Sequence, residues 1–457
     1  MMQTIRLIFP LPLFAALAAV LLLTGPSLTG YPGALAQAQE EEAEDKKAPM
    51  KGRKTQALGK QVYTLITDAN EKVDAEDYAG ARALIEKAKG LPKLTAYETA
   101  QIYSFSGFLN FNQDRYNPAL RDYEKVLAQP DLPEGLLQQT YKTIAQLLFA
   151  TEQYSKAIER AREYMNVAGE DPDMYALIAT GYYQLDQTNR IIQPIEKAIA
   201  LARERGTKPK EQWYLLQRVA YWEKEDYRKV RSILEILVTN WPKKEYWSQL
   251  SGIYYELKDE SRQLAAYEAA YDQGLLETSS ELTQMAQLFM QSEVPFKGAQ
   301  VLEEGLASGK IEKNERNLRL LSQAWQMAQE DRKAIEPLQQ AAKLSNDGDL
   351  YARLATSYLN LDQYKNCISA SRNAINKGGL KYPGDTWLVL GMCQFENKQL
   401  SAAKTSFQNA AKYDKSAKNA RSWITYTENE QARLQQLQES LNQLNEARQR
   451  AAERADS

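Results

Sequence analysis

The chain has 457 residues, of which 44% are hydrophobic and 25% are charged, as in ordinary soluble globular proteins. Its formal net charge of -2 does not indicate the basic surface that nucleic-acid binding requires. Histidine is absent, which excludes Ser-His-Asp and Cys-His catalysis and every histidine-containing metal site. We therefore predict no catalytic residue, no metal and no cofactor, and a protein that is not an enzyme. Carboxylate, lysine or tyrosine chemistry remains the open alternative.

Residues 1–36 have the pattern of a cleavable export signal. Arg6 precedes the apolar stretch 7–23, and the small residues Ala34 and Ala36 follow it. We expect cleavage after Ala36 and a periplasmic mature protein, with an uncleaved inner-membrane anchor as the alternative. No later stretch offers ~20 consecutive apolar residues, so the sequence predicts no membrane span in the mature chain.

Residues 37–59 are predicted to form a charged, flexible linker. Acidic residues over 40–45 are followed by basic residues up to Lys54, and apolar residues are few. Such a segment cannot offset its ordering entropy by burying apolar surface. The composition favours a solvated tether over a binding arm.

An internal repeat governs residues 62–417. A small residue is followed twelve positions later by a second one, at intervals that scatter around the ~34-residue period of stacked helical hairpins. The clearest pairs are Ala69/Ala81, Gly107/Ala119, Ala145/Ala157, Ala286/Gly298, Ala355/Cys367 and Gly391/Ala403. Placing the first member at position eight gives ten units, which begin near 62, 100, 138, 172, 211, 244, 279, 315, 348 and 384. Small residues at these positions let paired helices cross closely.

The repeat is irregular in its middle, and this leaves the register uncertain between about 200 and 280. Arg218 occupies position eight of the fifth unit, and Gln263 occupies position twenty of the sixth. Because both residues are large where small ones are expected, we regard this region as the least regular part of the array.

Two segments connect the repeat to a known family. One is Trp387-x-x-Leu390-Gly391, followed by Ala403, and the other is Tyr141-x-x-Ile144-Ala145, followed by Tyr154 and Ala157. Both resemble the tetratricopeptide repeat motif. The resemblance implies an all-α, right-handed superhelical solenoid of about ten helical hairpins, a fold that usually holds other proteins.

Residues 419–457 depart from the repeat and are predicted to form a C-terminal capping helix with a polar tail. Four leucines follow a three-four spacing within it, at 434, 437, 441 and 444. Solenoids need terminal caps for solubility, which favours the capping role. A short coiled coil that supports oligomerisation is the alternative.

The two cysteines, Cys367 and Cys393, fall in helices that we expect to pack against each other. In an exported protein such a pair can form a disulfide, and two buried thiols are the alternative.

In tetratricopeptide proteins the inner groove is lined by positions two, five, nine and twelve of the first helix of each unit. Position twelve carries aromatic residues in units two to six: Phe111, Phe149, Tyr183, Trp222 and Tyr255. We interpret these rings as a candidate partner-binding groove for an extended peptide, an apolar helix or sugar rings. The alternative is that they serve in packing.

These features favour a non-enzymatic periplasmic scaffold that binds proteins or peptides of the bacterial envelope. The whole chain resembles the periplasmic tetratricopeptide proteins that accompany TonB, ExbB and ExbD, which implies a link to energised uptake. An accessory protein of exopolysaccharide export, or a carbohydrate-binding protein, is the alternative.

Overall fold

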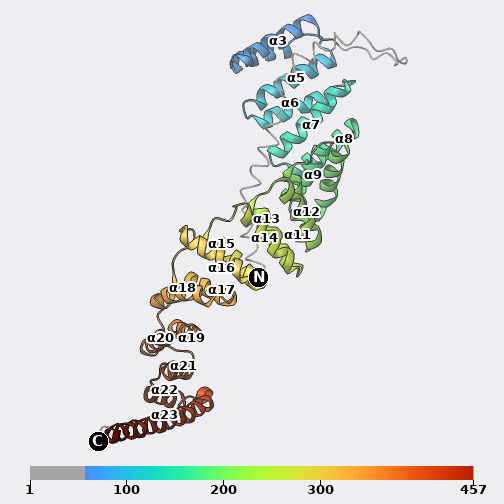
Figure 1. Cartoon of the computed structure of the whole chain (residues 1–457). Coiled ribbons are helices and arrows are strands. Elements are labelled where there is room, and N and C mark those ends of the chain that lie inside the picture. The colour runs from blue at the N-terminus through green and yellow to red at the C-terminus, as the bar shows by residue number, and fades with distance from the viewer. Residues whose placement is uncertain (1–56, 456–457) are drawn as a thin grey trace. The chain divides into compact units, whose positions relative to one another are not determined.

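The computed structural model describes residues 57–455, with the side chains up to residue 450. The predicted signal peptide (1–36) and all but the last three residues of the predicted linker lie outside the described residues. Within 57–455 the chain is all α-helical apart from turns and one short 3₁₀ helix, and the helices follow one another as hairpins (Figure 1). This confirms the predicted all-α array with a long C-terminal helix.

The described residues divide into two compact units, which meet in sequence at Trp241 and Pro242. In the first unit each odd-numbered helix from α3 to α11 is helix A of a hairpin, and helix B follows it. The first-unit helices are α3 (Lys60–Asp74), α4 (Tyr78–Lys89), α5 (Ala96–Phe111), α6 (Tyr116–Leu127), α7 (Glu134–Ala150), α8 (Tyr154–Ala168), α9 (Pro172–Gln184), η2 (Thr188–Arg190), α10 (Ile192–Glu204), α11 (Glu211–Glu223) and α12 (Tyr227–Asn240).

The second unit continues the same alternation and ends in a single long helix. Its helices are α13 (Lys244–Glu256), α14 (Glu260–Asp272), α15 (Ser279–Gln291), α16 (Pro295–Ala307), α17 (Glu315–Met327), α18 (Asp331–Leu344), α19 (Asp349–Asn360), α20 (Tyr364–Lys377), α21 (Pro383–Glu396), α22 (Leu400–Ala410) and α23 (Asp414–Ala455). The C-terminal helix therefore begins at Asp414, five residues before the predicted 419.

The small residues lie where the two helices of a hairpin cross. Ala69, Ala81, Ala145 and Ala157 are completely buried. A Cβ built on Gly298 would lie 2.7 Å from the carbonyl oxygen of Ala286, its partner twelve positions earlier. At this separation helix backbones are almost in contact, so a larger side chain forces them apart.

The sixth unit keeps the same crossing despite the large residue at its position twenty. In the sixth unit the Ser251 hydroxyl donates a hydrogen bond to the backbone carbonyl of Gln263 (2.9 Å). The contact is made by the backbone of Gln263, so its large side chain, which is half-buried, does not separate the helices. In the fifth unit Arg218 is buried in α11 and Val230 in α12.

Every helix A within the described chain ends with a residue in the left-handed conformation, at φ between 55° and 62°. These residues are Glu76, Asp114, Glu152, Asp186, Glu225, Lys258, Glu293, Gln329, Asp362 and Lys398. The next N–H donates to the carbonyl five residues earlier, as from Asp226 to Tyr221 (3.0 Å) and from Asp259 to Tyr254 (2.9 Å). This is the Schellman end of a helix. Counted from the predicted unit starts, all ten residues stand at position fifteen, including Glu225 and Lys258 in the irregular region.

The first hairpin extends into the segment predicted to be a linker. Leu58 packs against the core of the first two hairpins. The backbone N–H of Gly59 donates to a carboxylate oxygen of Glu98 (3.0 Å), whose other oxygen accepts from the N–H of Thr95 (2.8 Å). Burial opposes ionisation of Glu98, but these hydrogen bonds outweigh it and lower its pKa. Residues 57–59 therefore belong to the folded array.

Candidate functional site

The predicted aromatic stripe does not form a uniform row of exposed rings. Phe149 is buried, at 4% exposure, whereas Tyr255 is 65% exposed. Phe111, Tyr183 and Trp222 are half-buried. Its first four members lie in the first unit and Tyr255 lies in the second.

Most of these rings pack on a tyrosine five residues later, at the start of helix B. The ring centroids are 6.0 Å apart for Phe111 and Tyr116, and 5.1 Å apart for Phe149 and Tyr154. Trp222 packs in the same way, with its ring centroid 5.8 Å from that of Tyr227. The Phe149 and Trp222 contacts are edge-to-face and the Phe111 contact is tilted, and contacts of this kind stabilise the turn between the helices. The packing interpretation of position twelve therefore holds for these three rings.

Tyr255 is the most exposed of the five rings, and its hairpin lacks the packing tyrosine. The residue five positions later is Glu260, the first residue of α14. The Tyr255 side chain is exposed on α13, whereas Tyr183, which is followed by Thr188 at that position, is half-buried. It is the one predicted groove residue whose ring is mostly open to solvent.

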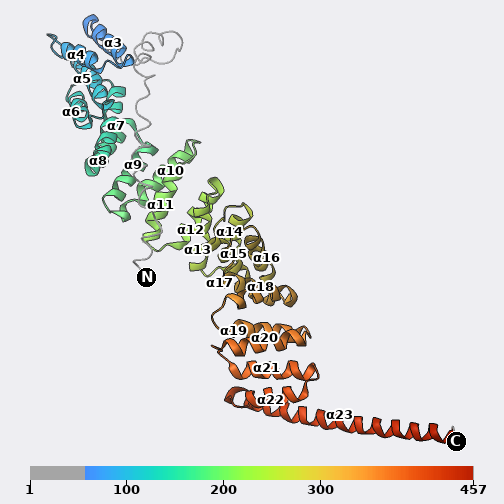
Figure 2. The ribbon, with the colours of Figure 1, turned by 90° about the vertical axis from the view of Figure 1, so that its left-hand side faces the viewer.

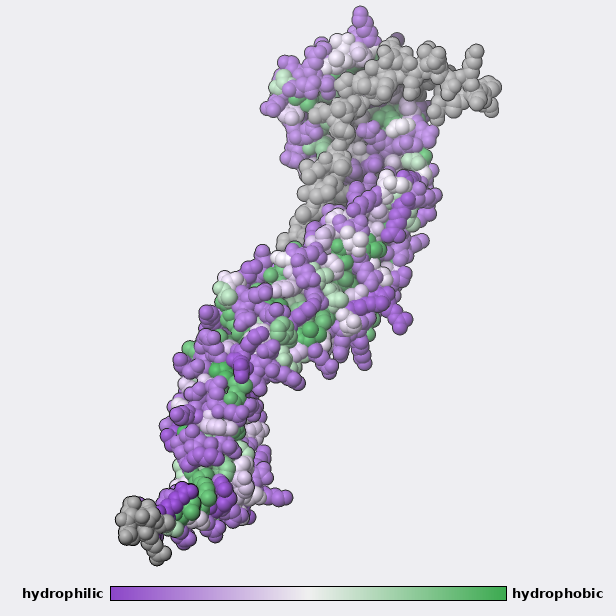
Figure 3. All heavy atoms as spheres, in the orientation of Figure 1, coloured by the Kyte–Doolittle hydropathy of each residue, from purple (hydrophilic) through white to green (hydrophobic). Residues whose placement is uncertain are grey.

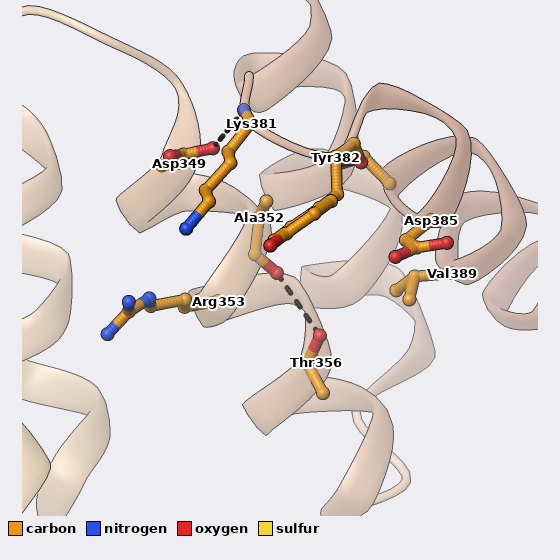
Figure 4. A pocket seen from close by; sticks show the side chains of 9 residues that line it. Asp349, Ala352, Arg353, Thr356, Lys381, Tyr382, Asp385 and Val389 are labelled. Carbon is orange, nitrogen blue, oxygen red and sulfur yellow. Dashed lines mark hydrogen bonds between the residues drawn. The ribbon is translucent and has the colours of Figure 1, made fainter. Parts of the chain in front are cut away.

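A pocket of about 230 Å³ lies between α19 and α21, the A helices of the last two hairpins (Figure 4). Asp349, Ala352 and Thr356 line it from positions two, five and nine of the ninth unit, and Asp385 lines it from position two of the tenth. These are the positions expected for the inner groove. The sequence-based choice of position twelve missed this pocket.

The loop before α21 supplies the other half of the pocket. The backbone N–H of Lys381 donates to a carboxylate oxygen of Asp349 (2.9 Å), which fixes the loop against the start of α19. The next residue, Tyr382, is 46% exposed, and its ring lies between Lys381 and Lys415, whose Nζ atoms are 5.3 and 5.2 Å from the ring centroid. Cation–π attraction holds a ring in such a position. In the sequence, the feature that could have indicated this part of the pocket is Tyr382, an aromatic residue directly before Pro383 at the start of α21.

The charges of the pocket are arranged around Tyr382. Figure 4 shows Arg353 and Lys381 on one side of the ring and Asp385 on the other. Ala352 and Val389 contribute apolar surface between them. The pocket can therefore accept an apolar side chain against Tyr382 while a carboxylate of the same segment faces Arg353 and Lys381.

A second, larger groove lies in the first unit, on the side of the B helices. It encloses about 1110 Å³ between α8 and α10, with α9 as its floor. Its polar groups are paired: Arg162 donates to the Tyr182 hydroxyl (2.7 Å), and Lys197 forms an ion pair with Glu170 (2.9 Å). A ligand there must compete with these contacts, so we place the candidate site between α19 and α21.

The two cysteines lie in the same region. A disulfide joins Cys367 of α20 to Cys393 of α21, with Cα atoms 6.1 Å apart. Both residues are completely buried. The bond connects helix B of the ninth unit to helix A of the tenth, so it fixes one of the two walls of the pocket to the neighbouring hairpin.

Within the described part of the chain, no group of histidine, cysteine, aspartate or glutamate residues is arranged to hold a metal ion. None of the described helices combines the length and apolar character that a membrane span needs.

No family model matches the chain, and no curated protein matches it. Among solved structures it is similar to a tetratricopeptide repeat protein from Parabacteroides merdae, at 15% identity and a TM-score of 0.34, over 58% of this chain and 99% of the other. It is similar to the TPR2AB domain of yeast Sti1, solved with pHSP90, at 16% identity and a TM-score of 0.34, over 58% and 100% of the two chains. It is also similar to the Cut9–Hcn1 hetero-tetramer of the APC/C, at 13% identity and a TM-score of 0.28, over 80% of this chain and 83% of the other. The ten hairpins, their small-residue crossings and their common helix ends make the described chain a solenoid of helical hairpins.

Proposed function

We propose that the chain is a non-enzymatic scaffold that holds segments of partner proteins on the surface of its A helices. The observation that carries this proposal is the open pocket between α19 and α21, which the groove positions of two successive hairpins form together. A repeated array supplies a long surface, and the pocket supplies a place on it where one side chain of a partner can be recognised.

The chemistry of the pocket favours a segment that carries an apolar or aromatic side chain next to an acidic one. Tyr382 offers an exposed ring, and Arg353 with Lys381 offers positive charge beside it. Rim charges of this kind contribute mainly to specificity and to the rate of association, whereas a buried aromatic contact contributes affinity.

We further propose that the scaffold works in the bacterial periplasm, linked to TonB-dependent energised uptake. The export signal predicted for residues 1–36 and the charged segment after it support this location. The mature protein, isolated from its host, should begin at Gln37 on N-terminal sequencing. An intact Met1 terminus would instead support the uncleaved anchor.

Site-specific crosslinking in the host tests the binding role. A photoreactive amino acid at Thr356, which lines the pocket and is exposed, should capture a discrete partner. The same group at Ser369, exposed on α20, is the control position. Capture at Thr356 should be lost in Tyr382→Ala and Arg353→Glu but retained in Arg332→Glu, an exposed charge on α18 outside the pocket. Equal capture at both positions, insensitive to the pocket variants, would refute the proposal.

The identity of the captured partner separates the finer alternatives. Recovery of an inner-membrane energy-transduction complex or an outer-membrane receptor supports the link to uptake. A partner from a polysaccharide-export system supports the alternative accessory role. For a direct carbohydrate function, the exposed Tyr255 ring is the remaining candidate for sugar stacking, and glycan binding should then be lost in Tyr255→Ala.

A further inference from the structure

The C-terminal helix α23 is 42 residues long, and its first half closes the array. Ala420 and Thr427 are completely buried. Between them the Trp423 ring stacks on Phe407 of α22 (centroids 5.4 Å apart) and meets Phe395 of α21 edge-on (5.6 Å). This half of the helix is the expected cap.

The second half of α23 leaves the array, and Figure 2 shows it continuing past α22. All residues from 432 to 450 are exposed. Leu434, Leu437, Leu441 and Leu444 are 37%, 50%, 43% and 48% exposed. We call these four residues the leucine seam. Glutamine, asparagine and charged residues surround the seam, and Figure 3 shows hydrophobic residues among hydrophilic ones near this end of the described chain.

The leucine seam continues the stripe by which the first half packs. The buried positions 416, 420 and 427 and the partly buried 423 are separated by four, three and four residues. The leucines at 434, 437, 441 and 444 follow in the same heptad register. A heptad stripe is the contact surface of a helix that packs along another helix. In the first half of α23, helices α21 and α22 cover the stripe, whereas in the second half the described chain provides no cover.

We propose that the leucine seam pairs with the same seam of a second copy of the chain, in an antiparallel two-helix coiled coil. The leucine positions are self-complementary in that arrangement. A two-fold axis at residue 439 places Leu434 opposite Leu444 of the second copy, and Leu437 opposite Leu441. All eight leucines are then removed from water.

The charges at the two ends of the seam select the antiparallel orientation. Glu430 and Arg448 occupy the next stripe positions before and after the leucines. In a parallel pair each of them meets its own copy, so like charges oppose each other at both ends. In the antiparallel pair Glu430 of each copy faces Arg448 of the other copy, so opposite charges meet at both ends. Between the ends, the flanking residues Gln438, Ser440 and Asn445 are uncharged and repel neither arrangement. The flanking Arg433 forms an ion pair with Glu430 of its own helix (2.8 Å), so Glu430 can contact Arg433 and Arg448 of the second copy together.

The contact is short, which limits its strength. The paired region runs from 430 to 448 and is therefore roughly 27 Å long at 1.5 Å per residue. An isolated peptide of this length is a marginal helix in water. Here docking of the first half of α23 on the array holds the helix in advance, so association does not have to order it.

Analytical ultracentrifugation of the full mature chain tests the pairing over a series of protein concentrations. We expect a reversible monomer–dimer equilibrium. Leu437→Asp should weaken dimerisation by roughly 100-fold or more, because a charge in the seam is desolvated without a partner. Gln435→Asp, which places the same charge on the outer face of the helix, should leave dimerisation unchanged. Both positions are exposed in the monomer, so neither variant should affect folding.

Distances between spin labels test the orientation. With a label on cysteine at position 450, the two labels of an antiparallel pair are separated along the axis by roughly 33 Å, given a 1.5 Å rise and an axis at residue 439. In a parallel pair they lie side by side. A chain that stays monomeric at all concentrations, a dimer that persists in Leu437→Asp, or a short label distance would overturn the proposal.

Discussion

Replacing Gly298 with alanine tests whether the small residues set the distance between paired helices. The added Cβ would lie 2.7 Å from the carbonyl oxygen of Ala286 and 3.3 Å from Cγ of Met290. Because the nearer obstacle is helix backbone, α15 and α16 must separate. Overpacking of this kind costs about 1–3 kcal/mol, whereas alanine is roughly 1 kcal/mol better than glycine inside a helix. We therefore expect Gly298→Ala to lower the free energy of unfolding by up to about 2 kcal/mol.

Gly252 provides the matched control. It lies inside α13, and a Cβ built on it would meet no atom within 4 Å. Gly252→Ala gains the same helix propensity without a steric conflict, so it should stabilise the chain by about 1 kcal/mol. The difference between the two variants, about 1–3 kcal/mol, then measures the steric cost at the crossing.

Urea unfolding of the full chain should be combined with amide hydrogen exchange, because solenoids often unfold in parts. Faster exchange in α15 and α16 of Gly298→Ala would locate the effect at the seventh hairpin. If both variants stabilised the chain equally, the close approach of the helices would not be what requires glycine at position 298.

Three other places in the fold can be tested by unfolding. Glu225→Gly should stabilise the chain by about 0.5–1 kcal/mol in urea, because glycine adopts the left-handed conformation of this helix end without a steric penalty. Burial raises the pKa of Glu281, but hydrogen bonds from the Thr278 backbone N–H and the Lys244 ammonium outweigh this effect and lower it from 4.5 to about 2. Since the folded pKa is the lower one, the wild type loses this stabilisation as the pH falls from 4.5 to 2, and the Tm of Glu281→Gln should change less over that range. Breaking the disulfide with Cys367→Ser should destabilise the oxidised chain by about 3 kcal/mol, and added reductant should then have no further effect.

The repeat register could be read from the sequence because helix crossings tolerate few side chains. The A helices of units four to eight begin at the predicted residues 172, 211, 244, 279 and 315. The pattern was weakest at Gln263, where the structure shows that a serine hydroxyl and a backbone carbonyl make the crossing. One small side chain facing the backbone of the other helix is sufficient for a close crossing. The sequence pattern of paired small residues can therefore fail at one position while the two helices still cross closely.

The left-handed residue at position fifteen had no recognisable sequence signal. Glycine is the residue usually expected in that conformation, but the ten positions carry glutamate, aspartate, lysine and glutamine. What these residues share is that they are polar and unbranched at Cβ. Their conformation follows from the hydrogen bonds of the preceding helix end and from the packing of the next helix. The conformational propensity of a single residue does not predict either of these.

The binding surface was harder to predict than the fold, because an aromatic residue at position twelve can serve packing or recognition. A tyrosine at position seventeen accompanies the packed rings Phe111, Phe149 and Trp222. Its absence does not by itself expose a ring, because Tyr183, followed by Thr188 at that position, is half-buried. Phe149 is buried against Tyr154, whereas Tyr255, followed by Glu260 at that position, is exposed. The final hairpin shows a further way to cover the ring, since Trp423 of the capping helix packs on Phe395. Recognition by aromatic rings is therefore to be expected where the fold provides no second ring to cover the first.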